Sequence, residues 1–432
     1  MELSRRHFLA GAGAVSLPLV LAACGFAPAA PKSTPKAGTL TFTTWGTDSE
    51  LAGFKQGISA FQAANPGATV TLNAVPYKEM FTNIDAQLQA GNPPDIFRVQ
   101  YYNFGSYAGR GQLLDLSTQL DSGFRDRFTP AAWSAVQNGG KPFGVPHHTD
   151  TSAILYNKAA FETAGVGPVP TAVEDAWTWD EFEKVAQKLR DSMPADKYPF
   201  AVNWQGNGVT RWLNWLFQAD GRFLEDDLVT PAIKSKAGAT ALDFTRSFFP
   251  KGFVPPSDSV QSSTLAADIW FSQTSAMGFA GAFLIPSAAK TLDFDWGATF
   301  FPRNVRAGGD LGGNALVATS ETGNPELAAS FLDFMTQEQP MRDFCSGASL
   351  LPTRADLVAG GIEFAQRSDL SPVFVGQASV VQAQDAGQVA SPDMTKIITV
   401  LKDQIELAFV GGQSTDDTLT AISAGIAKAT GG

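Results

Sequence analysis

The sequence has only two cysteines, Cys24 and Cys345, among its 432 residues, and only three histidines. So few cysteines exclude a disulfide framework as a source of stability, and Cys345 is expected to be a small buried hydrophobe. The chain also lacks the G-x-S-x-G motif of serine hydrolases and the H-E-x-x-H motif of zinc proteases. These absences give no support to a hydrolase, and we expect a binding protein and not an enzyme.

Positive charge is scarce as well. The chain carries 31 lysines and arginines against 42 aspartates and glutamates, for a net charge of −11. So acidic a protein is not expected to bind nucleic acid or, without an anchor, anionic lipid. With 44% hydrophobic and 17% charged residues, the composition is that of a globular protein with a large core. The length predicts two domains.

The N-terminus carries an uncharged apolar run, from Phe8 to Ala23, that is shorter than the roughly 20 residues of a membrane span. It is typical of the apolar part of a signal peptide. The preceding residues, SRRHFL at 4–9, resemble a twin-arginine export motif, and LAAC at 21–24 resembles a bacterial lipobox. That pattern implies cleavage before Cys24 and a lipid on the cysteine, whereas an ordinary secretory signal with a chance cysteine is the alternative.

The lipobox interpretation divides the N-terminal region into two segments. Residues 1–23 are expected to be the signal peptide, and residues 24–38 a tether that contains three prolines. Proline-rich segments are semi-extended and stiff, so this segment is a spacer and not part of the fold. Acyl chains on Cys24 would hold the protein at the membrane surface while the polypeptide stays in water.

The residues after the tether alternate between strand-like and helix-like patterns. Apolar and β-branched residues at period two predict strands over 38–45 and 69–75, with a third, short strand at 95–99. Apolar residues at three- and four-residue spacing predict helices over 51–64 and 77–90. A β-α-β-α-β order argues for a parallel, open α/β sheet, in which ligands gather beyond the carboxyl ends of the strands.

Short sequence blocks occur in a fixed order over most of residues 39–355. They are WG at 45–46, NPG at 65–67, GNPPDI at 91–96, KPFGVP at 141–146, AILYNK at 153–158, TWDEF at 178–182, SAMG at 275–278, GGNAL at 312–316, NPEL at 324–327 and LPT at 351–353. Each block is weak alone, and the ordered set is specific. The set resembles the bacterial extracellular solute-binding proteins of ABC sugar importers, the family of maltose-binding protein.

The resemblance implies an α/β, two-lobed periplasmic-binding-protein-like fold of type II, with an open α/β sheet in each lobe and a hinged cleft between them. Closure of such a cleft around a sugar precedes delivery to the permease subunits. The expected protein is a monomeric substrate-binding lipoprotein at the cell membrane, facing the extracellular or periplasmic side, with no cofactor. Carried over by block order, lobe 1 is residues 39–148 plus 313–350, lobe 2 is residues 149–312 plus 351–432, and the crossings lie near 147–149 and 312–314.

Sugar capture needs flat aromatic surfaces for the C–H faces and planar carboxylate or amide groups for the hydroxyl rim. Residues 204–215 hold three tryptophans among polar residues. Trp204 stands between Asn and Gly residues without helical spacing, so it is predicted to be an exposed stacking surface. Arg211 and Trp212 are further candidates for ligand contact, although Trp212 and Trp215 also fit a buried helix stripe.

The resemblance, taken position by position, implies further ligand contacts. Asp150 stands where relatives often have an acidic contact, and Phe283 stands where they often have a stacking tryptophan. Near the C-terminus, Lys396 and the apolar residues after it replace a tryptophan of maltose-binding protein, which argues against maltose itself. The remaining candidates are Trp45, Asp48, Gln100, Tyr101, Tyr102, Gly313 and Asn314.

A metal site would need a cluster of ligands that the sequence barely offers. Of His147, His148 and Asp150, only the last two share a face of a strand, and a catalytic zinc site commonly has three protein ligands. His148 is therefore interpreted as a hydrogen-bonding residue of the cleft or as a hinge residue. Tyr101 and Tyr102 resemble the tyrosine pair of ferric-ion binders, but they stand early in the chain. No metal is expected.

A glycosidase and a phosphate-containing ligand also have to be weighed. A secreted glycosidase needs only a pair of carboxylates, which any chain this acidic provides, so their presence proves nothing. Glycerol phosphodiesters or polyols could take the place of sugars as the ligand. A phosphate group would favour cations at the site, and Arg98, Arg110 and Arg211 are the candidates.

Overall fold

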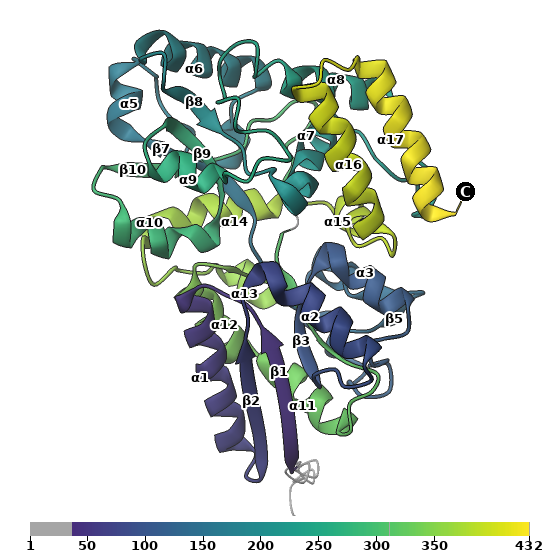
Figure 1. The fold of residues 1–432 in the computed structure, drawn as a ribbon. Helices are drawn as coiled ribbons and strands as arrows, with labels where there is room; N and C mark the ends of the chain where they lie inside the picture. The colour runs from purple at the N-terminus through teal and green to yellow at the C-terminus, as the bar shows by residue number, and fades with distance from the viewer. Residues whose placement is uncertain (1–36, 311, 432) are drawn as a thin grey trace, which may run out of the picture. The chain divides into compact units, whose positions relative to one another are not determined.

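The computed structural model describes residues 37–310 and 312–431, whose strands form two main sheets and a hairpin (Figure 1). The first sheet has the strand order β12-β6-β11-β3-β1-β2 and the second β10-β7-β9-β8. The first sheet consists of β1 (Gly38–Thr44), β2 (Ala68–Ala74), β3 (Ile96–Gln100), β6 (Val145–Thr149), β11 (Asn314–Ala318) and β12 (Leu351–Pro352). The second consists of β7 (Ser152–Asn157), β8 (Tyr198–Ala201), β9 (Ser275–Gly281) and β10 (Trp296–Thr299), and the hairpin pairs β4 (Gln137–Asn138) with β5 (Lys141–Pro142).

Helices accompany both sheets (Figure 1). Those drawn with the first sheet are α1 (Asp48–Ala64), α2 (Tyr77–Gln89), α3 (Tyr101–Gly109), α11 (Pro325–Met335), α12 (Glu338–Ala348) and α13 (Ala355–Gly360). Those drawn with the second are α5 (Lys158–Thr163), α6 (Trp179–Ser192), α7 (Leu213–Gln218), α8 (Lys236–Arg246), α9 (Ala266–Phe271), α10 (Ile285–Thr291), α14 (Ser371–Ser379), α16 (Met394–Phe409) and α17 (Thr415–Thr430). The short helices α4 (Pro130–Ser134) and α15 (Ala383–Val389) complete the α-helices of the described residues.

The predicted β-α-β-α-β order is confirmed for the first five elements, from β1 to β3. Strand β1 pairs in parallel with both β2 and β3, as the sequence pattern indicates. The prediction of a parallel sheet holds for β1, β2 and β3 but not for the complete sheet, because β11 pairs antiparallel with β3 and with β6, and β12 pairs antiparallel with β6. These three strands arrive from distant parts of the chain, so local patterns around β1 to β3 carry no information about their direction.

Helix α1 begins three residues earlier than predicted, because a capping box precedes its apolar stripe. The Thr47 side chain accepts a hydrogen bond from the backbone N–H of Glu50, and the Glu50 carboxylate accepts one from the backbone N–H of Thr47. This exchange satisfies two of the free N–H groups at a helix start. The carboxyl end of β1, with Trp45 and Gly46, is thereby held directly against the start of the helix.

Three segments connect the two sheets. Residues 150–151 join β6 to β7, residues 300–313 run from β10 to β11, and residues 353–370 lead from β12 towards α14. The first segment directly follows the predicted crossing at 147–149, and the second contains residues 312–313 of the other predicted crossing. Hinge motions are absorbed by a few residues in connections of this kind between two packed units.

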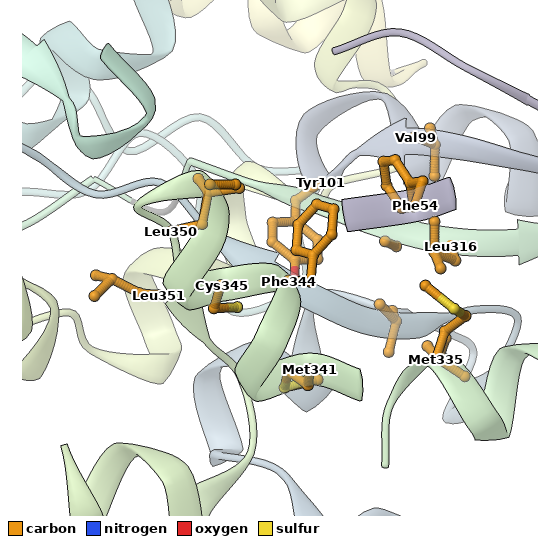
Figure 2. Close-up of a cluster of buried hydrophobic side chains, with 14 of the residues drawn as sticks. Phe54, Val99, Tyr101, Leu316, Met335, Met341, Phe344, Cys345, Leu350 and Leu351 are labelled. Atoms are coloured by element: carbon orange, nitrogen blue, oxygen red, sulfur yellow. The ribbon is translucent and has the colours of Figure 1, made fainter. Parts of the chain in front are cut away.

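The core under the first sheet is rich in aromatic rings (Figure 2). Phe344 of α12 packs against Phe54 of α1 at 4.6 Å between ring centroids and against His147 of β6 at 4.4 Å. Cys345, the next residue, is buried and free, as predicted, and burial raises the pKa of its thiol. Its protonated thiol is a small apolar group in this cluster and not a nucleophile.

The expected signal peptide, the lipid-attachment residue Cys24 and most of the tether lie outside the described residues. Within residues 37–310 and 312–431, no helix combines the length and the apolar character needed to cross a membrane.

The aromatic cluster makes a stability prediction. Phe344→Ala removes a buried ring that packs α12 against α1 and β6, and we expect a loss of about 3 to 5 kcal/mol in the free energy of unfolding. Urea unfolding followed by circular dichroism measures it. A loss below about 1 kcal/mol would show that the site collapses around the deletion and that the ring stack is not important for stability.

Candidate functional site

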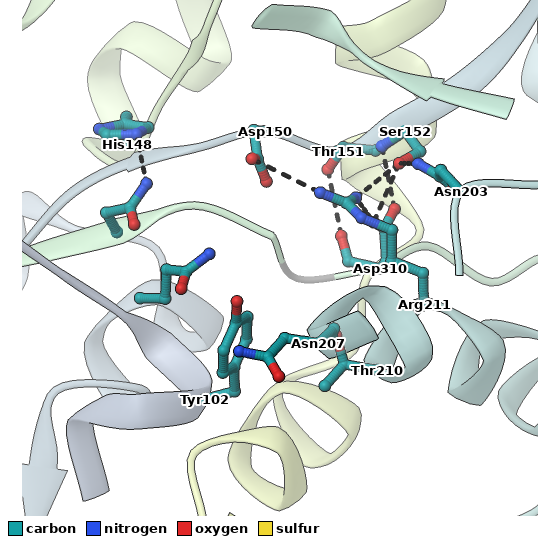
Figure 3. A network of polar contacts seen from close by, with 12 residues as sticks. Tyr102, His148, Asp150, Thr151, Ser152, Asn203, Asn207, Thr210, Arg211 and Asp310 are labelled. Atoms are coloured by element: carbon teal, nitrogen blue, oxygen red, sulfur yellow. Dashed lines mark hydrogen bonds and ion pairs between the residues drawn. The ribbon is translucent and has the colours of Figure 1, made fainter. Parts of the chain in front are cut away.

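The two sheets are joined at Asp150 and Thr151, and the guanidinium of Arg211 lies beside this junction. Arg211 belongs to the 3-10 helix η3 (Gly206–Trp212). Its Nη1 donates a hydrogen bond to Ser152 Oγ at 2.6 Å and forms an ion pair with Asp310, and its Nη2 lies 3.6 Å from Asp150 Oδ2 (Figure 3). One cation is thus shared by two carboxylates that belong to two different connections between the sheets.

Asp310 ties the connection from β10 to β11 to the start of β7. Its carboxylate accepts hydrogen bonds from the backbone N–H of Ser152 at 2.9 Å and from the Ser152 hydroxyl at 3.1 Å. Its backbone carbonyl accepts a third from Thr151 Oγ1 at 3.4 Å. The Ser152 hydroxyl in turn accepts a hydrogen bond from Asn203 Nδ2 at 2.8 Å. Because Asp310 is only 5% exposed, these partners replace the water that its charge has lost.

Two glycines let this connection approach the junction closely. A Cβ on Gly312 would overlap the carboxylate of Asp150, and one on Gly313 would overlap the backbone of His148 and Thr149. Gly313 also has a φ of +104°, in the region that favours glycine. The predicted crossings at 147–149 and 312–314 therefore lie against each other.

Asp150 has a carboxylate that the protein satisfies only in part. Burial raises the pKa of its carboxyl to about 6, and the nearby Asp310 adds to the rise while Arg211 opposes it. Its Oδ1 is buried and has no hydrogen-bond partner among the described residues. An ionised carboxylate oxygen without a donor is costly inside a protein. A ligand that supplies a hydroxyl would satisfy it.

The carboxyl edge of the first sheet provides a second set of side chains. Trp45 follows β1, Tyr77 follows β2, and Gln100 and Tyr102 stand at the end of β3 and the start of α3. The Tyr77 hydroxyl donates to Gln100 Oε1 at 3.2 Å and lies 3.1 Å from the Tyr102 hydroxyl. The charges of Arg211 and Asp150 both act on the pKa of the Tyr102 phenol, which burial raises. Gln100 lies opposite Asn314 of β11, and the backbone N–H of Tyr101 donates to the Gly313 carbonyl at 3.4 Å, so this edge adjoins the junction between the sheets.

A buried polar network supports this edge from behind. Arg98 of β3 forms an ion pair with Glu50 at 2.5 Å, donates to the Trp45 carbonyl at 2.8 Å and lies 4.5 Å above the Trp45 ring. With the Asn314 amide oxygen turned towards them, Arg98 Nη2 and His148 Nε2 lie 2.8 and 2.9 Å from that oxygen. Burial, with a contribution from Arg98, lowers the pKa of His148, so this histidine is neutral at pH 7.

The structure brings most of the predicted site residues to these two groups. Asp150, Arg211 and Gly313 lie at the junction, and Trp45, Gln100 and Tyr102 line the sheet edge. Asn314, His148 and Tyr101 lie behind it and are buried, and the Tyr101 hydroxyl donates to the His148 carbonyl at 3.1 Å. Phe283 is partly exposed beside Gly281, close to the backbone of Asp150, and Asp48 is exposed in the first turn of α1.

The prediction that Trp204 is an exposed stacking surface is wrong. The Trp204 ring is fully buried, packs 4.8 Å from Phe409, and donates its indole N–H to the Asp258 carbonyl at 2.6 Å. Of the Asn and Gly residues near it, Gly206, Asn207 and Gly208 form the start of the 3-10 helix η3, and Asn207 is exposed while the Trp204 ring points into the core. Trp212 is also fully buried and donates to Thr245 Oγ1 at 3.0 Å, so its interpretation as part of a buried stripe with Trp215 is confirmed.

Sequence reasoning missed three side chains of this region. Asp310 is the only charged residue in the glycine-rich stretch GGDLGG at 308–313. Such a stretch indicates close backbone approach, and this signal could have identified Asp310. Tyr77 directly follows the second predicted strand and could have been found by the strand-end rule. Nothing local marks Ser152, because its role depends on Arg211 from 59 residues further on.

Three of the four ring nitrogens of the histidine pair have hydrogen-bond partners among the described residues, and His147 Nε2 is buried without one. His147 Nδ1 and His148 Nδ1 lie 2.9 Å apart, and Asn314 accounts for the other ring nitrogen of His148. Among residues 37–310 and 312–431, no cluster of three or more His, Cys, Asp or Glu residues could hold a metal ion.

A family model described as bacterial extracellular solute-binding protein matches residues 45–342 of this chain. An arabinooligosaccharide-binding protein of Bacillus subtilis (strain 168) is 31% identical over 182 residues, which cover 40% of this chain and 39% of that relative. The match thus spans about two fifths of that relative's length. The maltodextrin-binding protein MdxE of the same strain is 25% identical over 321 residues, covering 69% of this chain and 70% of MdxE.

A lipoprotein and two solved structures add to these relatives. An uncharacterized lipoprotein of Streptomyces antibioticus is 24% identical over 366 residues, covering 78% of this chain and 74% of its own. The GacH receptor of Streptomyces glaucescens has a TM-score of 0.76 at 18% identity, covering 92% and 99% of the two chains. The maltotriose-binding protein of Thermus thermophilus has a TM-score of 0.71 at 21% identity, covering 90% and 99%. These likenesses confirm the predicted α/β fold of the type II periplasmic binding proteins.

The raised pKa of Asp150 makes a prediction about stability. The unfolded chain holds this proton less tightly than the folded protein, so ionised Asp150 destabilises the fold at pH 7.5 by roughly 1 to 3 kcal/mol. The contribution of Asp150 to the free energy of unfolding therefore rises as the pH falls from about 6 towards 4. We expect Asp150→Asn to be more stable than the wild type at pH 7.5, with the difference nearly gone at pH 4, measured by urea unfolding.

Asp310→Asn is the matched control for this experiment. It removes an acceptor that has partners and leaves Arg211 with the weaker contact to Asp150, so we expect a loss of about 3 kcal/mol at pH 7.5. An Asp150→Asn variant that is less stable than the wild type at pH 7.5 would contradict the assignment of Asp150 as an unsatisfied carboxylate.

Proposed function

Because this chain belongs to the bacterial extracellular solute-binding proteins, we propose that it captures a sugar outside the cell membrane and delivers it to the permease of an ABC importer. The family match over residues 45–342 is the observation that carries the proposal. The family consists of binding proteins, in agreement with the expectation of a protein that is not an enzyme. Names of relatives that bind arabinooligosaccharides and maltodextrins support a mono-, di- or oligosaccharide as the ligand.

The chemistry at the junction fits a neutral, hydroxylated ligand. Asp150 Oδ1 needs a donor, and a sugar hydroxyl is one. The Gln100 amide and the Tyr102 hydroxyl add groups that both donate and accept hydrogen bonds. Trp45, half-buried at the edge, provides an apolar ring for a C–H face.

A phosphodiester fits this site less well. Arg98 is neutralised by Glu50, and Arg211 is shared by Asp150 and Asp310. Arg110 is paired with Asp85 on an exposed surface. Within the described residues, each of these three candidate cations already has an acidic partner, so an anionic ligand would have to displace one. Polyols share the hydroxyl chemistry of sugars, so the test must separate them from sugars.

The two lobes follow the two sheets. Lobe 1 is residues 39–149 plus 314–352, which adds β12 to the predicted boundary because β12 pairs with β6. Lobe 2 holds residues 152–299 and the chain after residue 370, and residues 353–370 lead to it from lobe 1. The hinge consists of the connections at 150–151 and 300–313, and the sugar binds beside it, where closure brings Asp150 and Arg211 towards the aromatic edge.

The N-terminus anchors the protein. Lipid on Cys24 keeps the binding lobes near the permease, and residues 24–38 space them from the membrane. The similarity to a lipoprotein of Streptomyces antibioticus supports this assignment. The protein acts as a monomer, and the twin-arginine motif at 4–9 is its export signal.

A thermal-shift screen tests the sugar ligand. At a concentration 100 times Kd, a ligand stabilises the fold by about 2.7 kcal/mol, which raises Tm by several degrees. We expect a neutral saccharide to produce this shift and to be recovered intact by mass spectrometry. Asp150→Asn is expected to bind that saccharide at least about tenfold more weakly, because a hydrogen bond to a charged group is lost. Stabilisation by glycerophosphodiesters or polyols alone, or hydrolysis of the sugar, would contradict the proposal.

Membrane fractionation tests the anchor. In a bacterial host that matures lipoproteins, the wild-type protein is expected in the membrane fraction, with the mass of acyl chains on Cys24. Cys24→Ala is expected to be released in soluble form, whereas Cys345→Ala, the control for the second cysteine, stays membrane-bound. Equal partitioning of the wild type and Cys24→Ala would refute lipid attachment.

A further inference from the structure

With Trp204 buried, the aromatic surface that would meet a sugar has to be found elsewhere. The chain has nine tryptophans, all within the described residues, and eight of them are buried. Trp45 is the exception, and it is half-buried at the end of β1. A single partly covered ring offers a small surface for stacking, so a neighbouring side chain has to contribute to it.

Tyr77 lies directly against Trp45 and is unusually accessible. Its ring centroid is 5.5 Å from that of Trp45, and the two ring planes are tilted by 48°. Tyr77 is 42% exposed, and the other large hydrophobic side chains with comparable exposure are all aliphatic. Phe81, one helical turn further along α2, covers another side of Trp45 at 5.6 Å.

The exposed Tyr77 ring is held in place by its hydroxyl group. That hydroxyl donates to Gln100 Oε1 at 3.2 Å and lies 3.1 Å from the Tyr102 hydroxyl. A side chain that merely covered Trp45 would need neither partner. Anchoring an exposed ring at its polar end removes rotamer freedom before any ligand arrives, which lowers the cost of binding.

The strand pairing places these residues on one edge. Strands β1, β2 and β3 are parallel, with Thr44 of β1 opposite Ala74 of β2 and Thr43 opposite Phe97 of β3. Trp45, Tyr77 and Gln100 therefore all leave the carboxyl ends of neighbouring strands. Gln100 also lies opposite Asn314 of β11, the residue after Gly313, so this edge adjoins the junction described above.

We propose that Tyr77 is a ligand-binding residue whose ring, together with Trp45, forms the stacking surface for the sugar on lobe 1. This inference rests on the proposed function and assigns its aromatic contact. The apolar C–H face of the ligand lies on the two rings of lobe 1, and its hydroxyl rim faces Asp150 and Arg211. Recognition is therefore divided, with ring stacking on one lobe and charged hydrogen bonds at the junction.

Isothermal titration calorimetry with the whole protein tests this assignment. The probes are neutral mono-, di- and trisaccharides of glucose, galactose, mannose and arabinose. For the saccharide that binds, Tyr77→Phe keeps the ring and is expected to change Kd by less than about threefold. Tyr77→Leu and Tyr77→Ala remove the flat surface and are expected to weaken binding by about tenfold or more.

Two controls separate stacking from folding. Leu407→Ala removes a hydrophobic side chain of similar exposure, 44%, on helix α16, and is expected to leave Kd unchanged. The Tm of each Tyr77 variant without sugar is expected to stay within a few degrees of the wild type, because the ring is not part of the core.

The outcomes separate a failure of the Tyr77 assignment from a failure of the proposed sugar-binding function. Wild-type binding with an unchanged Kd in Tyr77→Ala overturns the assignment of Tyr77 alone. A Tyr77→Phe variant as weak as Tyr77→Ala overturns stacking, because the hydroxyl would then carry the effect. A wild-type protein that binds none of the saccharides overturns the proposed function and this inference with it.

Discussion

One guanidinium, that of Arg211, allows two carboxylates to lie side by side at the junction of the sheets. Asp150 and Asp310 come from different connections, and both have lost most of their contact with water. Without a shared cation, two buried like charges at this spacing would be strongly unfavourable. The position of η3, the approach of Gly312 and Gly313 and the start of β7 all depend on this cation.

The cation does not serve its two partners equally. Asp310 has an ion pair and three further hydrogen bonds to its carboxylate and carbonyl, so it is a structural residue. Asp150 keeps one oxygen without a donor, and its pKa is raised to about 6. A carboxylate oxygen without a donor lowers the stability of the folded protein. Binding sites keep such groups when a ligand supplies the missing hydrogen bond, because binding activity and stability compete. The tryptophans other than Trp45 are likewise packed inside the protein, whereas the ring of Tyr77 is exposed.

Local patterns in the sequence predicted the elements well and the side-chain environments less well. The period-two and helical spacing located β1, α1, β2 and α2 to within a few residues, because both signals arise within one element. The direction of β11 and β12 could not be predicted, since it depends on pairing with strands that lie far away in the sequence. The ordered family blocks predicted crossings near 147–149 and 312–314, and in the structure Gly312 lies against Asp150 and Gly313 against His148 and Thr149.

Trp204 shows why burial is harder to predict than position. Its neighbours are Asn and Gly, which normally indicate an exposed loop, but its indole N–H finds the Asp258 carbonyl and its ring finds Phe409. An indole N–H whose partner is a backbone carbonyl 54 residues away leaves no trace in the local sequence. Tyr77 is the opposite case, because it is an aromatic residue that the structure leaves 42% exposed.

A crystal structure of the protein with a bound saccharide tests the central claim most directly. We predict a sugar hydroxyl within hydrogen-bonding distance of Asp150 Oδ1, with the C–H face of the same sugar lying on the ring of Trp45. A saccharide bound elsewhere, with the carboxylate of Asp150 still lacking a donor, would contradict the account.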